Sequence, residues 1–302
     1  MTLLVGSIQL GLLYGVMALG IYITFRILQL PDLTVDGSFS LGMAVAAVIT
    51  VAGHPVLALI VAVLSGALAG LATGLLQTRL AIHPILSGIL VMTGLYTVNL
   101  FIMGGRANLS VMGNTTVFTQ SKTLVALVVA LFLTILLAVF FKTRFGLAIR
   151  ATGDNEDMVR SSSINADLMK CAGLILGNAC VGLAGALIGQ YQMFSDVGSG
   201  SGMVVIGLAS VIIGETIFGK RGVTIGLASA VGGSILYRII IALALRVDLF
   251  PSYALKLISS AIVVIALSGP SLRRGLEQQR VRRSVREHQR RLDSDASTGA
   301  SK

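Results

Sequence analysis

The chain is 302 residues long, and its formal net charge is +10. It is 55% hydrophobic and only 12% charged, whereas about a quarter of the residues of a soluble domain are charged. This composition argues against a soluble enzyme or binding module and predicts an all-α, polytopic membrane protein. We expect a transmembrane domain over residues 1–270 and a basic, partly disordered tail over residues 271–302.

The apolar stretches predict about nine transmembrane helices, with eight to ten allowed by the pattern. A helix needs roughly 17–25 apolar residues to cross a bilayer, and the second, seventh and ninth stretches are short. No basic region or small-residue cleavage site precedes the first stretch, so we expect a spanning helix there and not a cleaved signal peptide. The stretches are Leu3–Phe25, Ser38–Ala52, Val56–Gln77, Ile85–Met103, Leu124–Phe141, Leu168–Gln190, Met203–Phe218, Val223–Leu245 and Ala254–Leu267.

The first polar feature along the chain is LPDLTVDGSFS, over Leu30–Ser40. Asp32 and Asp36 are four residues apart and are flanked by Pro31 and Gly37. Such a segment at the edge of a membrane helix indicates either a broken helix lining protein or water, or an ordinary interfacial loop with a helix cap at Asp36 or Ser38.

The longest polar segment inside the membrane domain is the central loop over residues 142–168. It carries several basic residues, and basic loops of membrane proteins favour the cytoplasmic side. With nine alternating helices, Arg26, Arg79 and Lys220–Arg221 fall on that same side, as does the C-terminus. The N-terminus is then outside, unless a tenth crossing within residues 27–52 places it inside.

A second polar segment, SDVGSGSG over Ser195–Gly202, resembles the first one. Both combine Asp, Gly and Ser immediately before an apolar stretch, and they begin on opposite faces of the membrane. This arrangement is typical of an inverted repeat, whose paired broken helices meet near the membrane midplane. Glycines spaced four residues apart, such as Gly66, Gly70 and Gly74, predict close helix packing, mainly within the subunit.

Glu215 is an acidic residue beside an apolar stretch and therefore needs a partner. It indicates either a proton relay or a structural ion pair, with Lys220 and Arg221 near enough to help. The surrounding GETIFGK begins like a phosphate-binding loop, but Arg221 stands where Ser or Thr is required. The three histidines are scattered. We therefore expect neither ATP nor a metal ion to bind this chain.

The segment after residue 270 is strongly basic. Arg273–Lys302 contains nine Lys or Arg residues against four Asp or Glu residues. Because the rest of the chain is embedded in the membrane, this tail favours contact with anionic lipid headgroups over nucleic-acid binding.

Two longer segments carry a resemblance to a known family. FGLAIRATGDNEDMVRSSSIN and QYQMFSDVGSGSGMVVIGLASVIIGE resemble the permease subunits of bacterial ABC importers. The group is the one that includes branched-chain amino-acid, ribose and autoinducer permeases. FRILQLPDLTVDGSFSLG is more similar to permeases for aromatic amino acids such as tryptophan. The resemblance covers about residues 5–270.

The resemblance implies a bacterial cytoplasmic-membrane protein that pairs with itself or with a sister permease. Two ATPase subunits, which hold ATP and Mg²⁺, would bind its cytoplasmic face, and an extracytoplasmic binding protein would deliver a small solute, expected to be an amino acid. The family's coupling helix maps onto Gly146–Ile164, with the ATPase contact at an exposed turn formed by Gly153, Asp154, Asn155 and Glu156.

The two Asp-Gly-Ser segments are the expected lining of the translocation pathway. Their candidate residues are Asp32, Asp36, Ser38, Asp196, Ser199 and Ser201. An ion-coupled secondary transporter or a channel is the alternative, and it requires a relay of buried ionisable groups, for which Glu215 is the candidate. No catalytic set supports a membrane enzyme.

Overall fold

The computed structural model describes residues 2–119, 121–219 and 222–246, together with residue 264. Within these ranges, eight helices are long and apolar enough to cross a membrane, and they correspond to the first eight predicted stretches. The all-α, polytopic architecture is therefore confirmed. The ninth predicted stretch, apart from residue 264, and the tail over residues 271–302 lie outside the described residues.

The first half of the chain contains four membrane helices and a short strand. α1 (Thr2–Ile21) continues into a π-helical segment, η1 (Tyr22–Ile27), and is followed by α2 (Thr34–Val51), α3 (Pro55–Thr78), α4 (Pro84–Ile102) and β1 (Asn108–Ser110). Proline begins α3 and α4, where its missing N–H would have no helical partner.

Two short helices connect the two halves of the membrane domain. α5 (Lys122–Phe140) leads to α6 (Arg144–Asp154) and α7 (Glu156–Ser161). The second half then contains α8 (Ala166–Gln192), β2 (Phe194–Asp196), the 3₁₀ turn η2 (Val197–Gly200), α9 (Met203–Phe218) and α10 (Val223–Arg246). Side chains of Ser121, Thr143, Asn155 and Asn165 cap the starts of α5, α6, α7 and α8.

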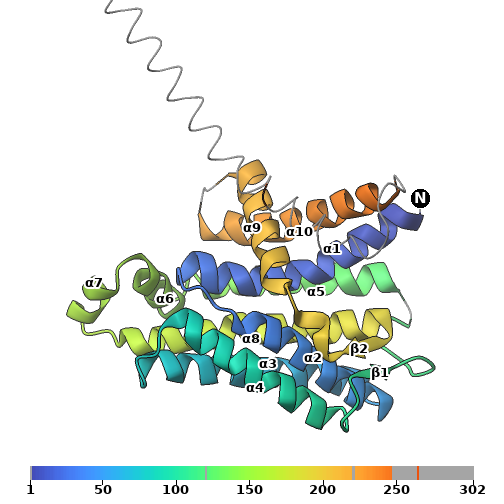
Figure 1. Ribbon diagram of the computed structural model, residues 1–302. Coiled ribbons are helices and arrows are strands. Elements are labelled where there is room, and N and C mark those ends of the chain that lie inside the picture. Colours follow the sequence, from blue (N-terminus) through green and yellow to red (C-terminus); the bar gives the residue numbers. More distant parts are fainter. Residues whose placement is uncertain (1, 120, 220–221, 247–263, 265–302) are drawn as a thin grey trace, which may run out of the picture.

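Helix α8 lies at the centre of the bundle, packed against α1, α2 and α3 (Figure 1). Glycine makes this close approach feasible: a Cβ atom on Gly66 or Gly70 of α3 would collide with the backbone of α8, and one on Gly185 of α8 would collide with the backbone of α2. The predicted use of these glycines, packing within the subunit, is confirmed.

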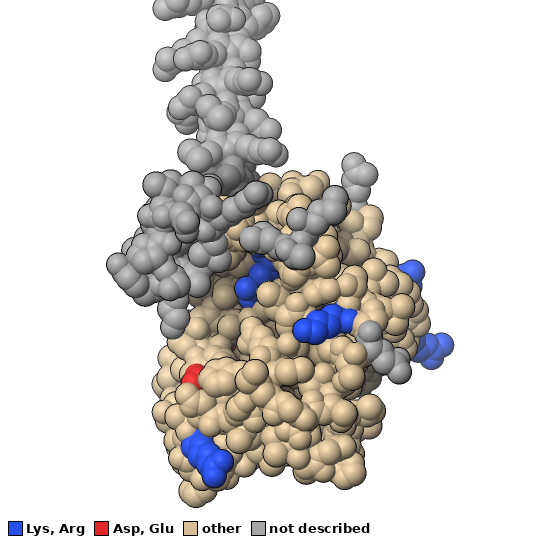
Figure 2. All heavy atoms as spheres, turned by 90° about the vertical axis from the view of Figure 1, so that its right-hand side faces the viewer, with Lys and Arg blue, Asp and Glu red and all other residues tan. Residues whose placement is uncertain are grey.

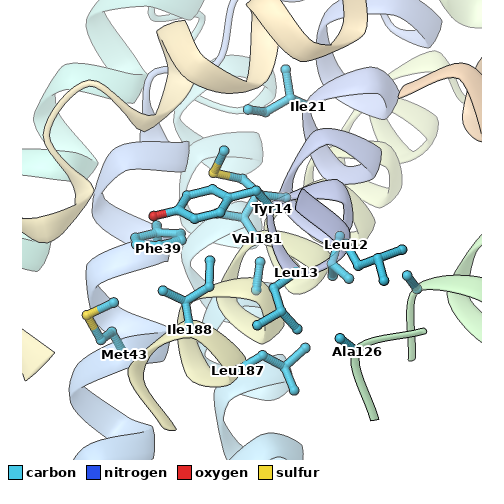
Figure 3. Close-up of a cluster of buried hydrophobic side chains, with 14 of the residues drawn as sticks. Leu12, Leu13, Tyr14, Ile21, Phe39, Met43, Ala126, Val181, Leu187 and Ile188 are labelled. Atoms are coloured by element: carbon cyan, nitrogen blue, oxygen red, sulfur yellow. The ribbon is translucent and has the colours of Figure 1, made fainter. Parts of the chain in front are cut away.

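The buried core joins α1, α2, α5 and α8. Leu13 and Tyr14 of α1 lie beside Phe39 of α2 and Leu187 of α8 (Figure 3). This cluster holds together helices from both halves of the chain, so the membrane domain forms one packed unit.

The two ends of the bundle differ in character. α6 and α7 project from one end, which we call the loop end, whereas the N-terminus and the β1–β2 sheet lie at the other, the sheet end (Figure 1). Asn108, Leu109 and Ser110 pair antiparallel with Asp196, Ser195 and Phe194. Viewed from the sheet end, few charged side chains are visible among the described residues (Figure 2).

Candidate functional site

Helix α6 of the central loop is packed onto η1, the π-helical segment that forms the end of the α1 membrane helix. Ile149 is fully buried, in a cluster with Ile27, Leu28 and Phe141. Gly153 lies against the backbone carbonyl of Ile27, where a Cβ atom would collide with it. A movement of α6 must therefore act directly on the end of α1.

Helix α7 is tied to α8 by a network of ion pairs. Glu156 pairs with Arg160 at 2.8 Å and with Lys170 at 2.6 Å, and Arg160 pairs with Asp167 at 2.6 Å. The hydrogen bond from Lys170 lowers the pKa of Glu156 below its ordinary value. Asn155 begins α7 by accepting a hydrogen bond from the Met158 N–H at 3.0 Å.

The four residues expected at the exposed turn differ in how far they are exposed. Asp154 and Asn155 are exposed, as expected. Gly153 is half-buried against Ile27 of η1, and the half-buried Glu156 holds α7 to α8, so these two residues are less exposed than expected. Their predicted contact with an ATPase stays a prediction. The apolar side chain of Met158, 52% exposed, lies beside the turn.

Glu215, near the end of α9, forms an ion pair with Arg26 of η1, with 2.6 Å between Oε1 and Nε. The sequence predicted an ion pair but with Lys220 and Arg221, which lie outside the described residues. A cavity of about 280 Å³ lies beside this pair and is also lined by Arg150 and Asp154 of α6. The loop end thus brings α1, α6 and α9 together around one cavity.

The two Asp-Gly-Ser segments meet inside the bundle. The Asp36 carboxylate accepts hydrogen bonds from the backbone N–H groups of Gly202 and Val204, both at 2.8 Å. Ser40 Oγ accepts a third from the Gly200 N–H at 2.9 Å. Side chains of α2 thereby bind one N–H group of η2 and two at the start of α9, where a helix cannot satisfy its own N–H groups.

This arrangement bears on the two interpretations of Leu30–Ser40. The N-cap residue of α2 is Leu33, which has no capping side chain, and the Thr34 N–H donates to Asp32, so the predicted cap at Asp36 or Ser38 is wrong. Asp36 instead caps α9, and the Ser38 hydroxyl donates to Asn178 Oδ1 at 2.7 Å. The break between η1 and α2 is partly buried: Leu28 and Asp32 are buried, whereas Gln29 is exposed. Irregular backbone is tolerated inside a membrane where it lies against protein or lines a water-filled space.

Asn178 of α8 connects this break to the centre of the bundle. Its Nδ2 donates to Asp32 Oδ2 at 2.7 Å, and the Thr34 N–H donates to Asp32 Oδ1 at 2.9 Å. Asp32, Ser38 and Asn178 are all buried. These hydrogen bonds compensate for burying polar groups that would otherwise destabilise the fold.

A second cavity, of about 350 Å³, lies beside the junction of α2 and α9. Asp36, Ser40 and Ser201 line it on one side, and Tyr96 and Asn99 of α4 line it on the other. Ser199 is half-buried, and Asp196 accepts a local hydrogen bond from the Gly198 N–H at 2.7 Å. The structure thus brings Asp36 and Ser201 to one cavity, whereas Asp196 caps the start of η2.

Sequence reasoning missed two polar residues inside the helices, Asn178 and Arg238. Both could have been found as single polar residues within apolar stretches. The Arg238 guanidinium lies over the Tyr14 ring, with Cζ 3.5 Å from the ring centroid. Among the described residues, no group of His, Cys, Asp and Glu side chains is placed to hold a metal ion.

Comparison with known proteins gives the family. Residues 3–267 match the family described as "Branched-chain amino acid transport system / permease component". The chain is 37% identical over 271 residues to the "Tyrosine transport system permease protein" of Clostridioides difficile, covering 89% of this chain and 91% of the relative. It is 32% identical over 276 residues to an uncharacterized protein of Rickettsia prowazekii, covering 89% of this chain and 98% of that protein. No solved structure matches the chain.

Proposed function

The chain belongs to the branched-chain amino acid transport permease family, and on that premise we propose that it is the membrane subunit of an ATP-driven importer. It is a multi-pass membrane protein and a transport subunit rather than an enzyme. The proposed solute is an amino acid, and the relative from Clostridioides difficile, which is named for tyrosine transport, supports an aromatic one.

The observation that carries the proposal is the rigid connection between the central loop and the membrane helices. Ile149 and Gly153 fix α6 to the end of α1, and Glu156 fixes α7 to α8. A partner that moves this loop also moves α1 and α8. This is what a subunit must provide when ATP is hydrolysed on another protein.

The proposed ATPase contact is the exposed part of the loop around Asp154, Asn155 and Met158. An apolar side chain among polar ones is a common composition for an interface that forms between separately folded subunits. ATP and Mg²⁺ belong to the ATPase in this proposal. An extracytoplasmic binding protein would dock at the sheet end, and a second permease, identical or a sister chain, would complete the membrane part.

The proposed pathway runs past the junction of α2 and α9. Asp36, Ser40 and Ser201 place polar groups beside a cavity whose other wall includes Tyr96. Asp32, Ser38 and Asn178 hold the backbone break in place behind it. A small zwitterion would find hydrogen-bonding groups there, together with the negative charge of the Asp36 carboxylate.

Co-purification with a candidate ATPase subunit tests the proposal. The expected result is a stable complex whose ATP hydrolysis rises when the binding protein is added with its solute. Asp154→Lys with Met158→Asp should weaken assembly, whereas Lys122→Gln at the sheet end should leave it unchanged. Unchanged assembly and hydrolysis in the loop variant would place the docking surface elsewhere.

A further inference from the structure

Arg238 is a charged residue well inside a membrane helix. It lies six residues before the end of the span Val223–Ala244, which corresponds to about 9 Å of helix. A charged side chain at this depth is costly unless it faces the protein interior or a water-filled space, and such residues commonly serve function.

Arg238 is held in place by an aromatic ring of another helix. Its guanidinium carbon lies 3.5 Å from the centroid of the Tyr14 ring, and Tyr14 is itself buried. The Tyr14 ring also stacks on Phe39 of α2, with 6.2 Å between centroids and 19° between planes (Figure 3). Phe39 is next to Ser40, so the arginine is connected through two rings to the junction of α2 and α9.

This stacking uses the face of the guanidinium and leaves its edge for hydrogen bonds. The Nε atom of Arg238 is buried and has no acceptor among the described residues. A buried donor without an acceptor is unfavourable, and the edge of a guanidinium matches the two oxygens of a carboxylate.

We propose that Arg238, oriented by Tyr14, forms a binding site for the carboxylate of the transported amino acid. This site rests on the proposed transport function and adds a residue that recognises one part of the solute. Arginine is better suited than lysine because its planar fork can donate two parallel hydrogen bonds while it stacks on tyrosine.

Two other oxyanions could accept hydrogen bonds from the same edge of the Arg238 guanidinium. One is the phosphate of a lipid headgroup. The other is the carboxylate of Asp248, which follows Arg238 by ten positions in the sequence and lies outside the described residues. The experiment must therefore distinguish three acceptors for Arg238: the solute, a lipid headgroup and an acidic residue of the same chain.

Binding of radiolabelled L-tyrosine to the purified permease in nanodiscs of zwitterionic lipid tests the site without an ATPase or a binding protein. We expect 3-(4-hydroxyphenyl)propionate, which has only the carboxylate, to compete, and tyramine, which has only the amine, to compete poorly. Arg238→Gln should weaken binding by about tenfold or more, and Arg238→Lys should weaken it less. Tyr14→Phe should bind normally and Tyr14→Leu more weakly.

The matched control is Lys122→Gln. Lys122 is also a cation over a tyrosine ring, 5.2 Å from the Tyr191 centroid, but it lies at the start of α5. This variant should bind tyrosine normally, whereas a loss equal to that of Arg238→Gln would overturn the assignment to Arg238.

Three results would overturn the proposal without requiring that Arg238→Gln fold. They are absence of tyrosine binding to the unmodified permease, equal competition by tyramine, and loss of binding when anionic lipid is added, which would assign the edge of the guanidinium to a lipid headgroup.

Thermal unfolding tests for an internal ion pair. Such a pair is indicated if Asp248→Asn lowers the melting temperature as much as Arg238→Gln does and the double variant lowers it no further. If binding behaves as expected but ATP-driven uptake is absent, only the proposed transport mechanism fails.

Discussion

The carboxylate of Asp36 accepts a hydrogen bond from the backbone N–H of Gly202, across 166 positions of sequence, at 2.8 Å. Its second oxygen accepts from Val204 at the same distance. One side chain therefore joins the starts of α2 and α9, which have 18 and 16 residues. These helices rise only ~27 Å and ~24 Å, less than the ~30 Å hydrocarbon core, so the backbone before each must be held by protein.

Asp36→Asn should destabilise the junction, because an amide has one acceptor oxygen where the carboxylate has two. We expect a loss of about 1–3 kcal/mol in the free energy of unfolding, with reduced transport. Thermal unfolding in detergent and uptake in liposomes measure both effects. Asp196→Asn is the control, since asparagine supports the same local turn. Equal melting temperatures for the two variants would show that Asp36 does not hold the junction.

Asn178→Leu should be more damaging, because it removes partners from two buried groups at once. Asp32 loses the donor to its Oδ2, and the Ser38 hydroxyl loses its acceptor. We expect roughly 2–4 kcal/mol of destabilisation and little folded protein. Ser65→Ala, which removes only a bond within α3, should melt near the unmodified protein. A folded, active Asn178→Leu variant would contradict the role assigned to this network.

The sequence predicted the positions of the membrane helices well, because length and apolar composition determine where a chain can cross a bilayer. It also indicated the breaks near Asp36 and Ser201, where Gly and Ser interrupt that composition. It could not predict which groups meet there. Asn178 and Arg238 are single polar residues whose partners, Asp32 and Tyr14, lie more than 100 positions away and depend on the packing of three helices.

Gly153, at the loop end, is another residue whose contacts could not be predicted from the sequence. The motif around it predicted an exposed turn, but only the packed structure shows that Gly153 faces the carbonyl of Ile27. The inverted repeat also stays a prediction. What the structure adds is that α2 and α9 begin at one junction, while α9 ends beside Arg26 at the loop end.

Gly153→Val should uncouple ATP hydrolysis from transport. The added side chain collides with the end of α1 and separates it from α6, while the exposed face around Asp154 remains available to an ATPase. We expect assembly and hydrolysis to persist and uptake to fall several-fold. The control is Gly94→Val in α4, where a Cβ atom meets nothing within 4 Å. Equal uptake by the two variants would mean that α6 does not act through α1.

The attachment of α7 to α8 should depend on pH in the acidic range. Because Lys170 lowers the pKa of Glu156 in the folded protein, the ion pair stabilises the loop fully above the ordinary glutamate value. That stabilisation is lost as the pH falls through the lowered value. A spin label at position 161, in a chain lacking Cys171 and Cys180, should gain mobility as the pH falls below the ordinary glutamate value of about 4.3.

Lys170→Gln is the control for this measurement. Without the ammonium group, the label should be more mobile at neutral pH and should change less on acidification. A label whose mobility is independent of pH in the unmodified chain would show that Glu156 does not hold α7.

The most direct test of the account is the energy source of uptake. The permease is reconstituted in liposomes with its ATPase and binding protein, and uptake of radiolabelled L-tyrosine is measured with ATP or a non-hydrolysable analogue, with and without ionophores that dissipate ion gradients. We predict uptake that requires ATP hydrolysis, persists with ionophores and is lost in Gly153→Val. Uptake by the permease alone, driven by an ion gradient and abolished by ionophores, would contradict the account.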